Sequence, residues 1–206
     1  MEENPSLILA SASPRRAQIL RDAGIAFEIV APRVEEIVLT GEPAEAMVLR
    51  LAETKARAAA ASLPSTKTRV FILAADTTVV AGADGAMILG KPTSPEDAAR
   101  MLRLLSGRTH RVLTGIAAIR LPDGEFRSAL EATLVTFAEI GEDEIARAIE
   151  SGEPFDKAGA YAIQGRAGRF VERVDGCYFN VVGLPLHRAC VLLGELGWPA
   201  YSAPLP

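Results

Sequence analysis

Two arginines stand at the start of a segment that has the pattern of a helix. In "LILASASPRRAQIL", a short apolar run is followed by Ser13, a favoured N-cap residue, and by Pro14, which suits the first helical position. Arg15 and Arg16 then face the positive end of the helix dipole, where each cation costs ~0.3–1 kcal/mol. A bound phosphate would reverse that cost. The stretch is equally consistent with a phosphate site and with two exposed arginines.

A lysine interrupts the apolar side of the next expected helix. Across Ala44–Ala61, small and apolar residues recur at helical spacing, and Lys55 falls inside this stripe. The lysine either extends past the edge of the stripe into solvent or reaches into a cleft that this face of the helix lines.

Carboxylates follow two of the expected strands. Asp76 ends the apolar run Val70–Ala75, and a carboxylate there is costly unless it is paired or binds a metal. Ligands of α/β sheets gather beyond the carboxyl ends of strands, so we expect Asp76 to lie at such an end. The alternative is a turn or capping aspartate. Glu35 and Glu36 follow another strand; they are either part of a solvated loop or, beside Asp76 and a polyphosphate, a source of Mg²⁺ ligands.

Two further segments carry polar residues with a possible role in binding. Lys91, in "ILGKP", precedes a helix, where a lysine usually faces solvent. Gln164, in "DKAGAYAIQG", offers a donor and an acceptor that match a nucleobase edge, although a plain surface loop fits equally well. His110 and His187 are too isolated to indicate a site. If the cations and acids named so far converge, they form a pocket for a metal-bound polyphosphate, without a Walker-type loop or a Rossmann glycine fingerprint.

Composition and charge exclude several classes of protein. The chain has 206 residues, 49% of them hydrophobic and 23% charged, which is typical of a globular domain. The net charge of −4 argues against general binding to nucleic acid or to anionic membranes. The first residues lack a basic region and a long apolar run, and Cys177 and Cys190 are too few for a disulfide framework. We therefore expect a cytoplasmic protein.

Strand-like and helix-like segments alternate along the chain. Residues 94–107 form the clearest helix, with Ser94 as the N-cap and Gly107 at the end. Residues 111–121 and 126–140 read as two strands joined at Pro122-Asp123-Gly124, and they predict an antiparallel hairpin. The sequence predicts an α/β fold, with a mixed, twisted sheet flanked by helices, in a single domain over residues 1–206.

Eight motifs in this order resemble the Maf family of nucleoside triphosphate pyrophosphatases, which are also named septum formation inhibitors. They are "LASASPRR", "VEE", "ETKA", "AADTTVV", "GKP", "MLRLLSGRTHRVLTG", "DKAGAYAIQG" and "NVVGLPL". The resemblance implies a fold like that of inosine triphosphate pyrophosphatases, with two lobes around a nucleotide cleft, in a homodimer. It implies hydrolysis of a nucleoside triphosphate to the monophosphate and pyrophosphate with a divalent metal, Mg²⁺ or Mn²⁺.

The resemblance also implies roles for individual residues. Asp76 matches the family's proton acceptor, and with Glu36 it would hold the metal. The positions that match phosphate-binding residues are Ser11, Arg15, Arg16, Lys55 and Lys91. Arg15, Thr77 and Gln164 match the branch that acts on dTTP and UTP, a substrate class that we expect to include modified pyrimidine triphosphates; a branch that prefers 7-methyl-GTP has Trp, Gln and Glu there. The alternatives are a 7-methyl-GTP pyrophosphatase and a nucleotide-binding regulator of septum formation without catalysis.

Overall fold

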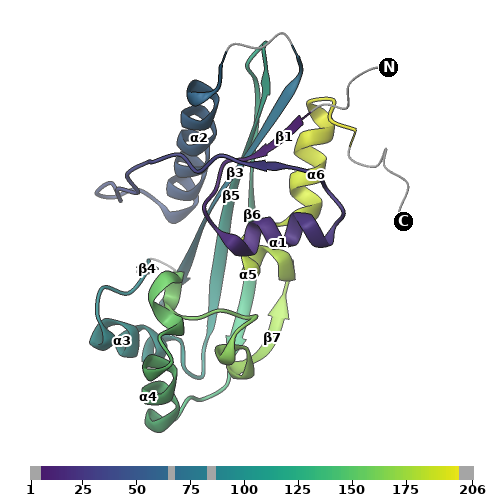
Figure 1. The fold of residues 1–206 in the computed structure, drawn as a ribbon. Helices are drawn as coiled ribbons and strands as arrows, with labels where there is room; N and C mark the ends of the chain where they lie inside the picture. The colour runs from purple at the N-terminus through teal and green to yellow at the C-terminus, as the bar shows by residue number, and fades with distance from the viewer. Residues whose placement is uncertain (1–5, 65–67, 83–86, 200–206) are drawn as a thin grey trace. The chain divides into compact units, whose positions relative to one another are not determined.

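The structure is a computed structural model that describes residues 6–64, 68–82 and 87–199 (Figure 1). Helices and strands alternate over most of this length, as the sequence predicts. In chain order the elements are β1 (Ser6–Leu9), α1 (Pro14–Asp22), β2 (Glu28–Ile29), α2 (Ala44–Ser62), β3 (Val70–Ala81), β4 (Met87–Leu89), α3 (Pro95–Leu105), β5 (Thr109–Leu121), β6 (Glu125–Phe137), α4 (Glu142–Glu150), the 3₁₀ turns η1 (Glu153–Asp156), η2 (Ala158–Ala160) and η3 (Arg166–Phe170), β7 (Val171–Asp175), α5 (Tyr178–Val182) and α6 (Leu186–Glu195).

The strands form one mixed sheet in the order β2-β1-β3-β5-β6-β7, with β4 also paired to β3. β1 runs parallel to β2 and to β3, and its last residue, Leu9, pairs with Leu73. β4 is antiparallel to β3 through pairs such as Val79 with Leu89. β5 and β6 are neighbours joined by only residues 122–124, which makes them an antiparallel hairpin. The predicted mixed α/β fold is thus confirmed.

The contacts within the chain divide it into two compact units. The first unit comprises residues 1–76, 114–131 and 183–206, and the second comprises residues 77–113 and 132–182. The strands β3, β5 and β6 each contribute residues to both units.

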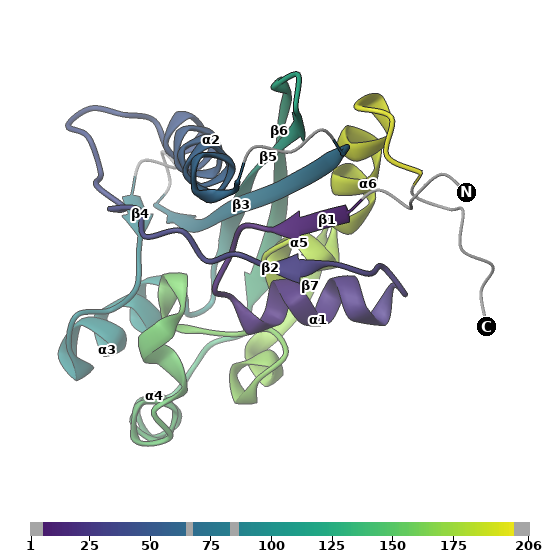
Figure 2. The same ribbon diagram turned by 45° about the horizontal axis from the view of Figure 1, so that its top comes forward.

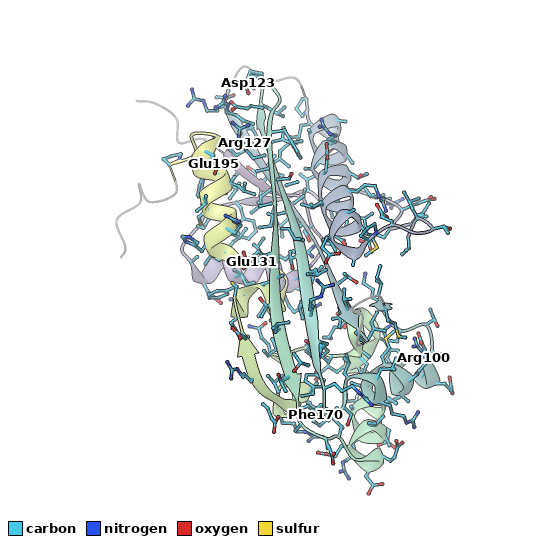
Figure 3. The ribbon with its side chains drawn as sticks, turned by 180° about the vertical axis from the view of Figure 1, so that it is seen from behind. Arg100, Asp123, Arg127, Glu131, Phe170 and Glu195 are labelled. Carbon is cyan, nitrogen blue, oxygen red and sulfur yellow. The ribbon has the colours of Figure 1, made fainter. Side chains whose placement is uncertain are left out.

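In the first unit, α2 covers one face of the strands and α6 lies on the other side (Figures 1 and 3). Alternate residues of the strands, including Ile8 and Ile72, pack with Ala52 and Ala56 of α2 in one buried cluster. Successive strand side chains point to opposite faces, so every second residue of β3 from Ile72 onward points to the α2 face.

A glycine sets how closely α2 approaches the sheet. A Cβ at Gly115 of β5 would lie 2.3 Å from the carbonyl oxygen of Val48 and 2.6 Å from the backbone nitrogen of Leu49. Both are backbone atoms of α2, so no side-chain rotation relieves the clash. Only glycine therefore permits this helix to lie so near the strands.

The end of the β5–β6 hairpin is tied to α6 by a hydrogen bond and an ion pair. Arg120 donates from Nη1 to the carbonyl oxygen of Leu196, 2.5 Å away, at the end of the helix. Arg127 and Glu195, which Figure 3 labels, lie on neighbouring elements with 3.7 Å between Nε and Oε2. These bonds fix the helix against the hairpin within the first unit.

The second unit has its own apolar core, formed by residues of α3, α4, η2, η3 and parts of the strands. Figure 2 shows the ribbons of α3 and α4. Helix α3 begins as predicted, because the Ser94 hydroxyl accepts a hydrogen bond from the backbone N–H of Asp97 at 3.2 Å. The short elements β4 and α5 have no counterpart among the expected segments. Each is too short to leave a periodic pattern in the sequence.

We predict that Gly115→Ala lowers the free energy of unfolding by about 1–3 kcal/mol, because α2 must move away from the sheet. Urea denaturation followed by circular dichroism measures the loss. Gly194→Ala is the matched control, since nothing lies within 4 Å of a Cβ there. Gly194 is inside α6, where alanine should be neutral or stabilising. Equal stability of the two variants would contradict the proposed close packing of α2.

Candidate active site

Three charged side chains of the first unit meet around the end of Lys55. The Lys55 ammonium donates to a carboxylate oxygen of Glu36 and to one of Asp76, each at 2.5 Å. The side chains of Lys55 and Asp76 are only 11% and 10% exposed, whereas that of Glu36 is 44% exposed. The cluster is therefore buried on one side and open to solvent through Glu36.

The elements explain why these residues meet. Asp76 lies four residues after Ile72 along β3, so strand alternation points it to the face that α2 covers. Lys55 belongs to the buried stripe of α2, beside Ala52 and Ala56. Lys55 is therefore buried and does not extend past the edge of the stripe into solvent. Glu36 comes from the segment between β2 and α2.

Asp76 lies inside β3 and not at a carboxyl end, where a ligand-binding carboxylate is expected. β3 continues to Ala81, because residues 79–81 pair with β4. The neighbouring strand β1, however, stops at Leu9, whose partner is Leu73. Asp76 therefore lies three residues beyond the carboxyl end of β1, where the sheet no longer has that neighbour.

The surroundings of Asp76 shift its pKa in opposing directions. Burial raises the pKa above its ordinary value, because desolvation penalises the charged form, and the nearby Glu36 carboxylate raises it as well. Lys55 and Arg16 act in the opposite sense, and burial prevails. Asp76 is thus a carboxylate that accepts a proton more readily than an exposed aspartate does.

Arg16 is a second fixed cation of the first unit. Its Nε donates to the carbonyl oxygen of Gly183 at 2.8 Å, and Nη1 donates to the Ser11 hydroxyl at 3.1 Å. Burial lowers its pKa, with Asp76 and Glu36 acting against that shift through their charges. A guanidinium remains protonated in proteins even so. The charge of Arg16 is therefore held in a set orientation and acts on the same carboxylates as Lys55.

The N-terminus of α1 differs in detail from the prediction. Ser13 occupies the N-cap position, but its side chain makes no capping bond. Its backbone N–H instead donates to the hydroxyl of Ser11, the buried residue that also binds Arg16. Arg15 is half-buried in the first turn, which contains no acidic residue. The expected positive charge at this helix end is present.

The remaining predicted site residues belong to the second unit. Thr77 is half-buried and directly follows Asp76, whereas Lys91 and Gln164 are exposed. The segments of the last two are joined, because the backbone N–H of Gly159 donates to the carbonyl oxygen of Gly90 at 3.1 Å. The structure thus brings Glu36, Lys55 and Asp76 into contact, and it places Lys91 and Gln164 on connected segments of the other unit.

The described residues hold no cluster of three or more His, Cys, Asp or Glu side chains with the spacing of a metal site. Glu36 and Asp76 nevertheless converge on one cation, the Lys55 ammonium. Mg²⁺ commonly takes one or two protein carboxylates and completes its shell with waters and substrate phosphates. The pair of carboxylates fits such an ion in donor type and number.

One contributor to the cluster was absent from the sequence prediction. The carbonyl oxygen of Gly183 fixes Arg16 across 167 residues of sequence. A backbone acceptor leaves no signal in residue type, although "NVVGLPL" contains this glycine.

Among residues 6–64, 68–82 and 87–199, the helices are all too short or too polar to cross a membrane.

Comparison with known proteins gives consistent matches over the chain. Residues 6–196 match the model of the Maf family, described as Maf-like protein. A relative from Symbiobacterium thermophilum, named dTTP/UTP pyrophosphatase, is 44% identical over 95% of this chain and 96% of its own length. A relative of the same name from Anaeromyxobacter dehalogenans is 48% identical over the same shares. The solved structure of the Staphylococcus aureus Ham1 protein aligns with 93% of this chain and 97% of that chain, with 18% identity and a TM-score of 0.47.

We predict that Lys55→Met destabilises the fold by about 3–5 kcal/mol at neutral pH, because it leaves a buried carboxylate without its cation. The folded pKa of Asp76 is already raised, so its charge opposes folding above that pKa, and loss of Lys55 raises the pKa further. The loss of stability should therefore shrink as the pH falls through the folded pKa of Asp76.

Urea denaturation with a chelator present, at neutral and acidic pH, measures this effect. Arg100→Met is the control, since Arg100 (labelled in Figure 3) is 52% exposed and forms a surface pair with Asp97. That variant should lose no more than about 1 kcal/mol. A pH-independent loss for Lys55→Met, or one as small as the control's, would refute the ionic account of the cluster.

Proposed function

The chain belongs to the Maf family, and we propose that it is a nucleoside triphosphate pyrophosphatase that hydrolyses dTTP and UTP to the monophosphate and pyrophosphate. The observation that carries the proposal is the buried Asp76 carboxylate bound to Lys55 and adjoined by Glu36 and Arg16. Relatives that match over most of their length and are 44% and 48% identical carry the name dTTP/UTP pyrophosphatase, which supports the choice of substrate.

Asp76 is the proposed general base. A water molecule attacks the α-phosphorus, Asp76 takes its proton, and the bond from the α-phosphorus to the bridging oxygen breaks, so that pyrophosphate leaves with the bonding electrons. A general base works best when its pKa lies near the working pH. Burial supports this role because it raises the pKa of Asp76 toward that range.

The cations stabilise the charge that develops on the leaving pyrophosphate. Preorganised charges aimed at that position lower the barrier without reorganising during the reaction. Arg16 supports this role best, because its bonds to Gly183 and Ser11 fix its guanidinium beforehand. The proposed phosphate-binding residues are Ser11, Arg15, Arg16, Lys55 and Lys91.

Glu36 and Asp76 are the proposed ligands of a divalent cation, Mg²⁺ or Mn²⁺. When bound, such an ion polarises phosphate oxygens and orients the attacking water. The Lys55 ammonium contacts both carboxylates and holds them close together. Asp76 keeps its position on β3 with or without a bound ion.

Arg15, Thr77 and Gln164 are the proposed determinants of substrate choice. The Gln164 amide offers one donor and one acceptor group, which suits the edge of a pyrimidine. Its exposure leaves these groups accessible. Modified pyrimidine triphosphates would present the same edge and are included in the proposed substrate class.

We further propose that residues 1–206 act as one Maf-like domain. The protein would be a cytoplasmic homodimer, and its ligand would be the nucleoside triphosphate substrate. The match of the family model over residues 6–196 supports a single functional domain. The net charge of −4 supports the absence of nucleic acid and membrane partners.

The experiment that tests the proposal measures products from a panel of nucleoside triphosphates, with Mg²⁺, with Mn²⁺ and with a chelator. Metal-dependent pyrophosphate release from dTTP and UTP, with little from 7-methyl-GTP, is the expected result. Release mainly from 7-methyl-GTP would overturn the substrate assignment. A folded protein that binds nucleotide and releases nothing would overturn catalysis in favour of a septum regulator.

Asp76→Asn should lower kcat for UTP by about 10²–10⁴-fold, because the amide cannot take a proton from water. The variant should still fold, with a lower thermal midpoint, because the buried Lys55 ammonium keeps only the Glu36 carboxylate as a charged partner. Asp143→Asn, at an exposed position of α4, is the matched control and should retain full kcat. Steady-state kinetics and a thermal melt decide the question. Near-normal turnover of Asp76→Asn would exclude the residue as the base.

Gln164→Glu should lower the hydrolysis of dTTP and UTP without lowering the stability of the fold, because a carboxylate offers acceptors only. We expect a loss of about 10-fold or more in kcat/KM for both substrates, with the thermal midpoint unchanged, since Gln164 is exposed. The ratio of kcat/KM between UTP and GTP is the readout. An unchanged ratio would remove Gln164 from base recognition.

A further inference from the structure

The segment that carries Gln164 runs between α4 and β7 (green in Figure 1), and Gln164 lies between the short 3₁₀ turns η2 and η3. Such a segment has no ladder of backbone bonds to hold it. A side chain that selects a base must nevertheless be held to within a fraction of an ångström of its working position. The contacts on either side of Gln164 therefore decide whether it can select a substrate.

On the C-terminal side of Gln164, the carboxylate of Glu153 binds the backbone. Its Oε2 accepts the N–H of Arg166 at 2.9 Å, and its Oε1 accepts the N–H of Ala167 at 3.5 Å. Carboxylate acceptors make hydrogen bonds roughly twice as strong as neutral ones. Glu153 thus binds the backbone two and three residues after Gln164.

Gly165 makes room for this carboxylate. A Cβ at Gly165 would lie 2.0 Å from Oε1 and 2.8 Å from Oε2 of Glu153. The backbone of Gly165 has φ −103°, which other residues adopt without strain. The glycine is therefore needed for the space that the carboxylate fills and not for its conformation.

Glu153 is itself held in place by its own backbone bonds. Its carbonyl oxygen accepts from the Lys157 ammonium at 2.6 Å, and its N–H donates to the hydroxyl of Ser151 at 3.3 Å. The carboxylate therefore projects from a fixed turn, η1, which follows α4 directly.

A second anchor lies on the N-terminal side. The Tyr161 hydroxyl and Nε2 of His110 are 2.8 Å apart, and both side chains are buried against the ring of Phe137. Burial lowers the pKa of His110 to about 4, so the pair is neutral at physiological pH and stays intact. Ala160, next to Tyr161, has φ +63°, a strained conformation that persists only where its neighbours impose it.

We propose that Glu153 is a positioning residue for substrate selection: its carboxylate, seated over Gly165 and bound to the N–H groups of Arg166 and Ala167, holds Gln164 in the orientation that reads the substrate base. The His110–Tyr161 pair fixes the other end of the same segment. The inference rests on the proposed function, and it assigns to Glu153 an effect on base selection that acts through Gln164 and not on the phosphates.

The test compares Glu153→Ala, Gly165→Ala and Glu153→Gln. The first removes the carboxylate, and the second expels it while leaving it in the protein. Each should lower kcat/KM for UTP by about 10–10²-fold, mainly through KM, and bring it closer to the value for GTP. Glu153→Gln keeps one acceptor oxygen and should recover part of the selectivity. Glu172→Ala, at an exposed position of β7, is the control and should change nothing.

A double-mutant cycle separates positioning from a general loss of structure. In a Gln164→Ala background, Glu153→Ala should change kcat/KM for UTP by less than about twofold, because the group on which it acts is gone. Additive effects, or a loss that is equal for UTP and GTP, would overturn the inference even if the wild-type protein is active. If Glu153→Ala does not fold, the same cycle with Gly165→Ala decides. A wild-type protein inactive on dTTP and UTP would overturn the proposed function and the inference together.

Discussion

The contact of the Lys55 ammonium with the Asp76 and Glu36 carboxylates is the interaction on which the charged cluster of the first unit depends. Without it, a buried strand would carry a charged Asp76, and Glu36 would add a second negative charge beside it. A buried charge pair contributes little net stability, because desolvation offsets most of the attraction. The arrangement is therefore poorly explained as a device for folding. Burial raises the pKa of Asp76, which agrees with the proposed role of this residue as a general base.

The fold brings these groups together through simple periodicities. The two-residue repeat of β3 points Asp76 toward α2, and the helical repeat of α2 places Lys55 among its buried alanines. Gly115 allows the backbone of the same helix to approach β5 closely at Val48 and Leu49. The regular repeats of one strand and one helix thus bring the ammonium and the carboxylate together.

Much of the fold and several residues of the candidate site could be predicted from sequence, and the features that could not be predicted have physical reasons. A lysine inside an apolar stripe and an aspartate after an apolar run break local rules, and such breaks point to the candidate site. The strand β4, which pairs with residues 79–81 of β3, has only three residues and leaves no pattern of its own in the sequence. The bond from Arg16 to Gly183 involves a backbone acceptor, and the two bonds of Glu153 involve backbone donors. Backbone partners are chosen by the fold, so residue types alone do not reveal them. His110 looked isolated because its partner, Tyr161, is 51 residues away.

The most direct measurement is hydrolysis of UTP in ¹⁸O-enriched water, with mass spectrometry of both products. If Asp76 activates a water that attacks the α-phosphorus, one ¹⁸O atom appears in the uridine monophosphate and none in the pyrophosphate. Label in the pyrophosphate would place the attack at the β-phosphorus and contradict the account.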